Sequence, residues 1–556
     1  MSDTELRDKT TRRTLWKGEQ DAGVEHSRLP GFPSGSLELI QGGCVLSTSR
    51  PGSSSVTAAR DAGRTGFSKW SWAVGLTTLF YSGMAMWRPS FWTDEAATIS
   101  AVRRTITDLY ALLANIDAVH GAYYTLMLGW TGLFGFSEVS LRLPSLIAVS
   151  CAAVLFFELG RKVVGTSYGL VATALLILLP RTQYVATDAR SYALTLLGAV
   201  AATYLLVSIR ERPAAAKWCG YALVGFFTVS LSFYCVLLVF AHALTVVLDS
   251  RLRQEWRRLL ASSAGWVAPA LFIGGIASQQ QFQISWIREV GPAFPYEFFF
   301  LQFFADGYFI LGGDIIPTPT PGENWSMTAL AVVLWIAAFV SAIAIRRHFL
   351  LRLAIPWLLL PPAVVIGGSL LTGGDYYLPR YLTFVLPSMA LLAAAPVLAL
   401  SGPSNLRAPY RRPLICVAVA AVFLVCMPSY LGQRTQFGRD PQDDFRFVAR
   451  AVEELGRPGD SFVIDYSNDL MFQAYPASFS NLADPTLGIT AVQWKRIFNQ
   501  RFDVASSAER IRKYPVVILI EKTNESKLSV ALQELGYSPR ESHRGPSTTV
   551  TKFIHE

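Results

Sequence analysis

Two adjacent carboxylates, Asp94 and Glu95, lie in segment 91–97, directly after the first long apolar run of the chain. A carboxylate beside a membrane is costly unless water or a partner solvates it, so the pair needs an explanation. One explanation is local, because Thr93 or Asp94 could cap a helix that begins here. The other is chemical, because an ionised carboxylate can act as a general base that deprotonates a hydroxyl as it attacks an activated carbon.

Other polar residues of catalytic types lie in later breaks between apolar runs. Arg190 and Arg380 suit a phosphate, since a planar guanidinium can donate two parallel hydrogen bonds, although arginines at span ends also commonly reach to lipid headgroups. His120 could donate to a substrate or have only a local partner. Together with Asp117 and Asp188 it could also hold Mg²⁺ or Mn²⁺, but the spacing is not diagnostic and leaves the metal requirement open.

Membrane helices are the elements that must position these residues. The 556-residue chain is 51% hydrophobic and 16% charged, below the roughly 25% of charged residues in soluble domains. Its apolar runs are long enough to cross a hydrocarbon core, which takes about 20 helical residues. We predict about eleven spans, at 71–89, 141–159, 167–183, 192–208, 216–231, 233–248, 263–279, 326–345, 353–371, 382–400 and 414–429.

The breaks between the runs fall into two alternating sets. The basic breaks lie at 161–162, 210–212, 251–258, 346–352 and 407–412. The breaks between them carry Asp94, Asp188, Asp306, Asp314 and Asp375. Because Lys and Arg in short loops stay in the cytoplasm, we predict a cytoplasmic N-terminus, an extracytoplasmic C-terminus and an outer face shared by the acidic breaks. The formal charge of +9 is spread over these breaks, so it indicates topology and not a nucleic-acid partner.

Two residues within predicted spans receive structural assignments. Arg142, at the outer end of the second span, is assigned to headgroup anchoring. His242, inside the sixth span, is assigned to a hydrogen bond between helices.

The external loop 90–140 carries more than the acidic pair. Apolar residues recur from Ile99 to Leu113 at steps of three and four, which predicts an amphipathic helix along the membrane surface. Residues 123–134 are too few to span and are predicted to form a second interfacial helix.

The two ends of the chain differ from the membrane region. Residues 1–70 have mixed charge and no long apolar run, and we predict a disordered cytoplasmic tail. Residues 430–556 are predicted to form a small extracytoplasmic α/β domain, with helices at 445–455 and 526–535 and strands at 461–465 and 515–520. Asp465, Asn468 and Asp469 there could contact an acceptor, but a turn rich in these residues needs no function.

Four motifs occur in a fixed order on the predicted outer face. They are the pair Asp94-Glu95, the segment His120-Gly121-Ala122-Tyr123-Tyr124, the segment Asp188-Ala189-Arg190-Ser191-Tyr192 and the segment Leu378-Pro379-Arg380-Tyr381-Leu382. Together with Leu141-Arg142-Leu143-Pro144-Ser145, they resemble the GT-C superfamily of polyprenyl-phosphate-sugar transferases over roughly residues 71–400. That superfamily includes protein O-mannosyltransferases, the lipid A aminoarabinose transferase and actinobacterial mannosyl- and arabinosyltransferases. The segment at 120–124 lacks the family's two prolines.

The resemblance implies an inverting hexosyl- or pentosyltransferase with a GT-C-like helical membrane fold. Its donor would be a polyprenyl-phosphate sugar, with mannose as the family-level sugar, and its acceptor an extracytoplasmic glycan, glycolipid or protein of the cell envelope. It implies Asp94 as the base, with Glu95 in support. The implied substrate-binding residues are Asp117, His120, Tyr123, Asp188, Arg190, Tyr192, Arg380 and Tyr381.

Three alternatives predict other features. A flippase or transporter should carry charged groups near mid-membrane. A polysaccharide ligase or polymerase should have a large external loop rich in His and Arg. A membrane scaffold that presents the C-terminal domain should tolerate changes at Asp94.

Overall fold

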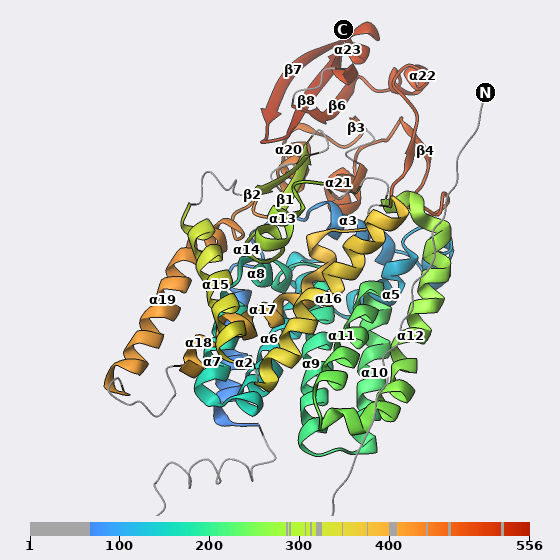
Figure 1. Cartoon of the computed structure of the whole chain (residues 1–556). Helices are drawn as coiled ribbons and strands as arrows, with labels where there is room; N and C mark the ends of the chain where they lie inside the picture. The colour runs from blue at the N-terminus through green and yellow to red at the C-terminus, as the bar shows by residue number, and fades with distance from the viewer. Residues whose placement is uncertain are drawn as a thin grey trace, which may run out of the picture. The chain divides into compact units, whose positions relative to one another are not determined.

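Apolar helices follow one another through residues 67–432 of the computed structural model of the chain (Figure 1). The structure describes residues 67–556 apart from 285–286, 288–290, 306, 312–313, 319–324, 347, 375, 400–407, 441–442, 465–468 and 524–526. The predicted tail therefore lies outside the described residues up to position 66, as do Asp306, Asp375, Asp465 and Asn468.

Six helices of the described chain are long and apolar enough to cross a membrane. They are α6 (Glu138–Val163), α9 (Tyr192–Glu211), the segment Leu252–Gln283 around α12 (Trp256–Ala277), α15 (Trp325–Ala344), α16 (Phe349–Thr372) and Arg412–Gly432 within α19 (Ala408–Gly432). Shorter helices occupy the other predicted spans: α2 (Lys69–Gly83), α10 (Ala215–Leu231), α11 (Leu237–Leu248), α17 (Leu386–Ala393) and α18 (Pro396–Ala399). The multi-pass helical fold is thus confirmed, and the count of eleven stays a prediction.

The predicted span 167–183 is broken in the structure. It consists of α7 (Thr166–Leu178) and α8 (Pro180–Ala186), which meet at an angle of 71°. Pro180 stands at the break, where a residue without an N–H cannot continue the helical ladder of the preceding turn. As a result α8 turns aside and leads the chain directly to Asp188.

The basic ends of several spans lie together. Arg210 at the end of α9 and Arg352 at the start of α16 both approach Asp249, at 3.1 and 3.5 Å. Lys162 at the end of α6 pairs with Glu211 of α9 at 2.6 Å. The opposite ends of α6 and α9 lead to Arg142 and Arg190, so the basic and acidic breaks do fall at opposite ends of these helices. Which end faces the cytoplasm stays a prediction.

His242 lies between helices as predicted, within hydrogen-bond distance of Thr203 on α9 and Tyr221 on α10, at 3.1 and 2.8 Å.

The loop that carries Asp94 folds into four short helices: α3 (Thr93–Val102), α4 (Ile106–Leu113), η1 (Ala118–His120) and α5 (Gly121–Phe134). The predicted helix from Ile99 is interrupted, because Thr105 accepts a hydrogen bond from the N–H of Asp108 and starts α4. Most of α3 is buried, and it packs against α5 on one side and against α21 (Asp469–Ala474) of the C-terminal region. It therefore lies between two layers of protein, whereas α4 exposes Ile106 and Tyr110. A position along the membrane surface stays a prediction for α4 and α5.

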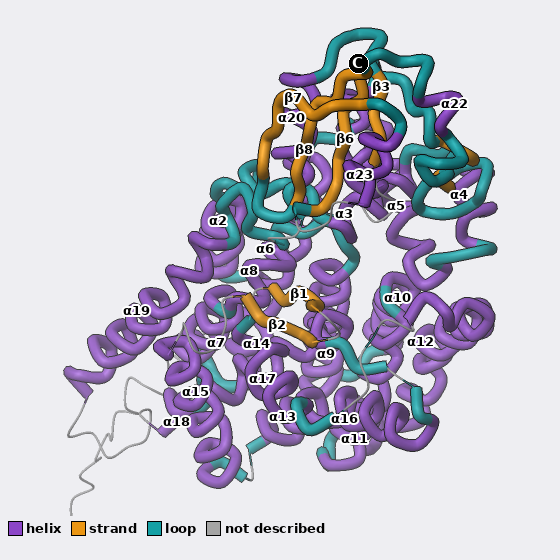
Figure 2. Tube along the Cα trace, turned by 90° about the horizontal axis from the view of Figure 1, so that it is seen from above, coloured by secondary structure: helices purple, strands orange, loops and turns teal. Residues whose placement is uncertain are grey.

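The C-terminal region contains a four-stranded sheet beyond one end of the helices (Figures 1 and 2). Its strand order is β3 (Ser461–Ile464), β6 (Val516–Lys522), β8 (Thr548–His555) and β7 (Tyr537–Arg544), with β3 and β6 parallel and the others antiparallel. The α20 helix (Phe445–Leu455) and α23 (Lys527–Glu534) complete the region. The α/β prediction is confirmed, whereas the β7–β8 hairpin was not predicted.

Smaller elements join these parts. They are α13 (Phe294–Tyr296), α14 (Gln302–Phe304), η7 (Pro379–Val385), α22 (Ala508–Ile511), β1 (Gly307–Leu311), β2 (Asp314–Thr318), β4 (Leu487–Ile489) and β5 (Gln500–Arg501). Asp469, a possible acceptor contact, is fully buried and pairs with Arg501 at 2.8 Å, so it ties this region together internally.

Candidate active site

Asp94 lies in the first turn of α3, but it does not cap that helix. The capping group comes from Asp443, which accepts hydrogen bonds from the backbone N–H and the hydroxyl of Thr93 at 2.5 and 3.0 Å. This contact satisfies a free N–H group of the helix terminus from 350 residues further along the chain. The local explanation for the acidic pair therefore fails for Asp94, whose carboxylate points elsewhere.

The carboxylate of Asp94 faces two arginines. Its Oδ2 atom lies 3.0 Å from Nη1 of Arg380 and 3.8 Å from Nε of Arg190. The side chains of Asp94, Arg190 and Arg380 are 18%, 8% and 14% exposed, so the cluster is largely desolvated yet still open to a ligand. Its two cations and one anion leave a net positive charge.

His120 completes the cluster as a neutral hydrogen-bond donor. Its Nε2 atom lies 3.0 Å from Nη2 of Arg190. Because a guanidinium can only donate, Nε2 must accept, and the ring proton then resides on Nδ1. Burial and the charges of Arg190 and Arg380 hold the pKa of His120 well below its usual value, in agreement with the neutral ring that the contact with Arg190 requires.

Asp117 and Tyr124 support Arg190 from the far side. Tyr124 donates to Oδ2 of Asp117 at 2.9 Å and accepts from Nη1 of Arg190 at 3.3 Å. Asp117 has a left-handed backbone with φ of 61°, which an Asp tolerates better than most residues. Burial raises its pKa. Tyr123 is buried beneath this group, and its hydroxyl has no hydrogen-bond partner within the described chain.

A half-enclosed cavity of about 250 Å³ adjoins the cluster. His120, Tyr192 and Tyr381 line it. Tyr192 is 4% exposed, and its hydroxyl finds no partner among the residues that the structure describes. The structure thus brings Asp94, His120, Arg190, Tyr192, Arg380 and Tyr381 to one place.

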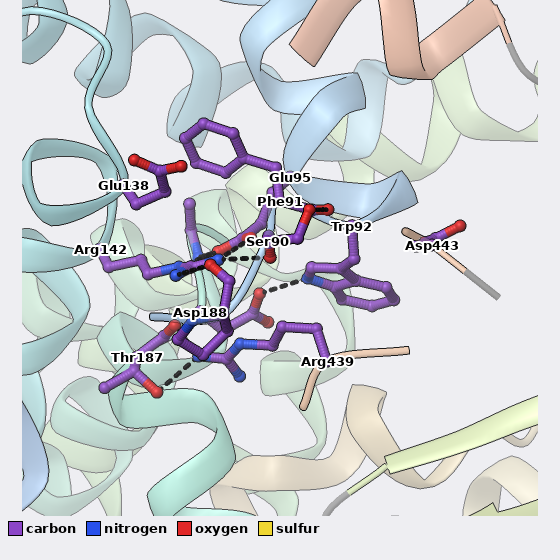
Figure 3. Close-up of polar contacts among 12 residues, drawn as sticks. Ser90, Phe91, Trp92, Glu95, Glu138, Arg142, Thr187, Asp188, Arg439 and Asp443 are labelled. Atoms are coloured by element: carbon purple, nitrogen blue, oxygen red, sulfur yellow. Dashed lines mark hydrogen bonds and ion pairs between the residues drawn. The ribbon is translucent and has the colours of Figure 1, made fainter. Parts of the chain in front are cut away.

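Glu95 occupies a different environment (Figure 3). It forms a fully buried, two-point ion pair with Arg142 at 2.8 and 2.6 Å, and Oε1 also accepts the N–H of Ala189 at 3.0 Å. Arg142 donates further to the carbonyls of Met86, Pro89 and Ser90. Anchoring to headgroups is therefore the wrong assignment for Arg142: it holds the loop before α3 to the α6 helix. Glu95 is enclosed with it, which removes the carboxylate from any substrate.

Asp188 lies next to this ion pair and not in the arginine cluster. It accepts a hydrogen bond from the indole N–H of Trp92 at 3.0 Å, while its Oδ2 has no hydrogen-bond partner in the described part of the chain (Figure 3). Burial, with Glu95 nearby, raises the pKa of Asp188 to about 6. The described residues include no group of three His, Cys, Asp or Glu placed to hold a metal ion, so Asp117, His120 and Asp188 do not form the ligand set considered above.

Segment 433–446 supplies supporting residues that the sequence did not reveal. Besides Asp443, Arg439 donates to the carbonyl of Tyr184 at 2.8 Å and to Thr187. Arg446 bonds Glu138 at 2.6 Å and the carbonyls of the loop before α3. No motif marks this segment, since each contact joins residues more than 250 positions apart.

Comparison with solved structures identifies the architecture. ArnT from Cupriavidus metallidurans bound to undecaprenyl phosphate superposes with a TM-score of 0.52 at 14% identity, over 87% of this chain and 97% of ArnT. The apo state of that protein gives 0.51 at 14% identity, over 90% and 98%. The chain has a GT-C membrane fold.

Other comparisons add less. The archaeal oligosaccharyltransferase AglB from Archaeoglobus fulgidus, in complex with an inhibitory peptide and a dolichol-phosphate, gives a TM-score of 0.48 at 12% identity, over 87% of this chain and 74% of AglB. No family model and no curated protein matches the sequence. The GT-C fold confirms the fold class that the motifs implied.

Proposed function

We propose that this protein is a membrane glycosyltransferase that moves a sugar from a polyprenyl phosphate to an acceptor outside the cytoplasm. The observation that carries the proposal is the placement of Asp94 against Arg190 and Arg380 at the end of the helices. The GT-C fold supports it, because ArnT has been solved on that fold with undecaprenyl phosphate bound.

The two arginines are proposed to bind the phosphate of the donor. Negative charge builds on that phosphate as the sugar leaves, and fixed cations in a desolvated site stabilise it. In the resting structure the same cations hold Asp94. Phosphate oxygens would take over these contacts, and binding of the donor would release the carboxylate for chemistry.

Asp94 is proposed to act as the general base. An acceptor hydroxyl forms a new bond to the anomeric carbon and gives its proton to Asp94. The bond from the anomeric carbon to the phosphate oxygen breaks, and polyprenyl phosphate leaves with the electron pair between Arg190 and Arg380. A single displacement of this kind inverts the anomeric centre.

The neighbouring residues are proposed to fix the reactants. Neutral His120 donates from Nδ1, and Tyr124 with Asp117 holds Arg190 in place. Tyr123, Tyr192 and Tyr381 are proposed to shape the substrate side. Glu95 and Asp188 are proposed to position α3 and the segment before α9, since neither faces the arginines.

Three finer points stay proposals: the first two follow from the resemblance, and the third follows from the alternation of basic and acidic breaks. The sugar is mannose, the acceptor belongs to the cell envelope, and the N-terminus is cytoplasmic with the C-terminus outside.

Complementation tests the reaction. A deletion strain receives the wild type, Asp94→Asn, Arg380→Ala or the control Arg212→Ala, which changes an exposed arginine at the distant end of α9. Envelope glycans are then profiled by mass spectrometry. We expect the wild type and the control to restore the missing glycan and the two site variants to fail. Full restoration by Asp94→Asn at equal protein level would contradict the proposed base.

Cysteine accessibility tests the sidedness. Single cysteines at the exposed positions 93 and 372, in the breaks that carry Asp94 and precede Arg380, are labelled with a membrane-impermeant maleimide in intact cells and in inverted vesicles. Labelling only from the cytoplasmic side would overturn the topology.

A further inference from the structure

The cavity beside the arginine cluster differs sharply from the cluster in its charge. The described residues that line it include no Asp, Glu, Lys or Arg. They include four tyrosines, three glutamines, three serines and one histidine, His120, which is neutral. It touches the cluster through His120, bonded to Arg190, and through Tyr381, which follows Arg380 in the chain. A ligand whose phosphate meets the arginines would therefore extend its next group into an uncharged chamber.

The cavity has room for one small ring. Its volume of about 250 Å³ lies below the roughly 300–1,000 Å³ of pockets that hold drug-sized ligands. The rings of Tyr234 and Tyr381 lie 5.3 Å apart at its wall. Aromatic faces of this kind pack well against the C–H surfaces of a sugar.

Polar groups in the lining are ready for hydroxyls. The hydroxyl of Tyr192 is buried and without a partner among the described residues, and His120 offers Nδ1–H. Of the three glutamines, Gln280 and Gln283 already accept the N–H groups of Ala118 and Asp117, at 3.1 and 3.0 Å. The amide of Gln281 has no hydrogen bond to any described residue and is exposed in the lining.

We infer that this cavity binds the glycosyl group of the donor and selects a single uncharged, hydroxyl-rich sugar ring over an amino sugar or a uronic acid. The inference rests on the proposed function, since it places the sugar next to the phosphate site. An ammonium or carboxylate group on the ring would lose water without gaining an opposite charge from the lining, which is costly. Hydroxyls can instead donate and accept among Tyr192, Gln281 and His120.

Binding measurements with defined lipids test the inference. The full-length protein in nanodiscs is titrated with undecaprenyl phosphate and with its mannosyl, 4-amino-4-deoxyarabinosyl and galacturonosyl esters, each competing against a fluorescent undecaprenyl phosphate. We expect the mannosyl ester to bind about tenfold tighter than either charged ester. Equal affinities for the three esters, or a preference for a charged one, would overturn the inference.

Two variants locate the selectivity. Gln281→Glu adds a carboxylate to the lining and should shift the ratio of amino-sugar to mannosyl affinity by about tenfold towards the amino sugar. Tyr192→Phe removes only a hydroxyl and should weaken the mannosyl ester by about three- to tenfold. Both variants should unfold at the same temperature as the wild type in detergent, which shows that they are folded. If Gln281→Glu fails this check, the test rests on Tyr192→Phe alone. Unchanged binding of the mannosyl ester to Tyr192→Phe would contradict the proposal that the cavity binds the sugar.

The outcome also separates the two proposals. If undecaprenyl phosphate itself does not bind to the wild type, the proposed function fails. If it binds but the sugar esters are not distinguished, only the selectivity of the cavity fails.

Discussion

Asp94 and Glu95 are consecutive in the chain and lie in opposite environments. Glu95 is fully buried, and both of its oxygens are bound, by Arg142 and by the N–H of Ala189. Asp94 is 18% exposed, and Arg380 and Arg190 approach its carboxylate at 3.0 and 3.8 Å. One helical turn thus presents one carboxylate to the interior and one to an open site.

The difference teaches which of the two can do chemistry. A buried ion pair in which both carboxylate oxygens and all the N–H donors of the arginine are hydrogen-bonded is rigid, and removing one partner leaves the other charge without compensation. The arginines beside Asp94 can also bind a ligand, so the Asp94 carboxylate can give up its contacts with them when a ligand arrives. The Glu95–Arg142 pair therefore builds the scaffold, and the Asp94 cluster provides the reactive groups. Four changes test this division.

Asp94→Asn should have the largest effect on activity. It keeps the size of the side chain and removes its basicity, so transfer from a polyprenyl-phosphate sugar should fall by about 10²–10⁴-fold. Because the amide no longer occupies the arginines as an anion, undecaprenyl phosphate should bind at least as tightly as before. Radiolabelled transfer and lipid titration of the same preparation measure both. Weaker lipid binding with normal transfer would assign Asp94 to the scaffold instead.

Glu95→Gln should act on stability. It leaves Arg142 charged and buried beside a neutral group, at a cost of about 3–5 kcal/mol. The thermal unfolding midpoint in detergent should drop well below that of Asp94→Asn, which serves as the matched control one position away. A variant with unchanged unfolding and abolished transfer would show that Glu95 takes part in the reaction, contrary to the comparison.

Arg380→Ala should weaken donor binding. Hydrogen bonds to charged groups contribute about 1.5–3 kcal/mol, so the affinity for undecaprenyl phosphate should fall by roughly 10- to 100-fold. Arg212→Ala, which removes an exposed arginine at the far end of α9, should leave it unchanged. Equal losses in the two variants would indicate general attraction of the lipid and no specific phosphate site.

The sequence predicted the residues of the active cluster better than the residues that hold them in place. Asp94, Arg190 and Arg380 lie in three separate breaks that charge alternation places on one side of the membrane, and the order of the motifs grouped them into one site. The helix 445–455 and the strands near 461 and 516 were found because their apolar periodicity is strong.

The support was hidden for physical reasons. Arg142 near a span end looks in one dimension like an arginine that reaches to headgroups, and only the folded loop shows three carbonyls around it. The cap that Asp443 gives to α3 joins residues 350 positions apart. Strand β7 is mostly exposed and polar, so it lacks an apolar pattern. The break at Pro180 was not predicted either, because the apolar run 167–183 continues through the proline and was taken as one span.

Asp188→Asn should have the smallest effect, and it tests the boundary between the two environments. Asp188 adjoins the scaffold through Trp92 but keeps one oxygen without a hydrogen bond in the described structure. Since burial raises its pKa to about 6, the folded protein holds its proton over a range in which the unfolded chain, with a pKa near 3.9, has lost it. Stability from this group is therefore greatest at low pH and falls as the pH rises through about 6.

Between pH 5 and pH 7 this loss amounts to about 1.3 kcal/mol, and Asp188→Asn should remove it. The measurement is the change in unfolding midpoint between the two pH values, in the variant relative to the wild type, so that contributions from other titrating groups cancel. If both proteins respond equally, Asp188 is ionised and partnered throughout and belongs with the satisfied scaffold. If only the wild type loses stability towards pH 7, the unsatisfied carboxyl marks where the scaffold ends and the exchangeable site begins.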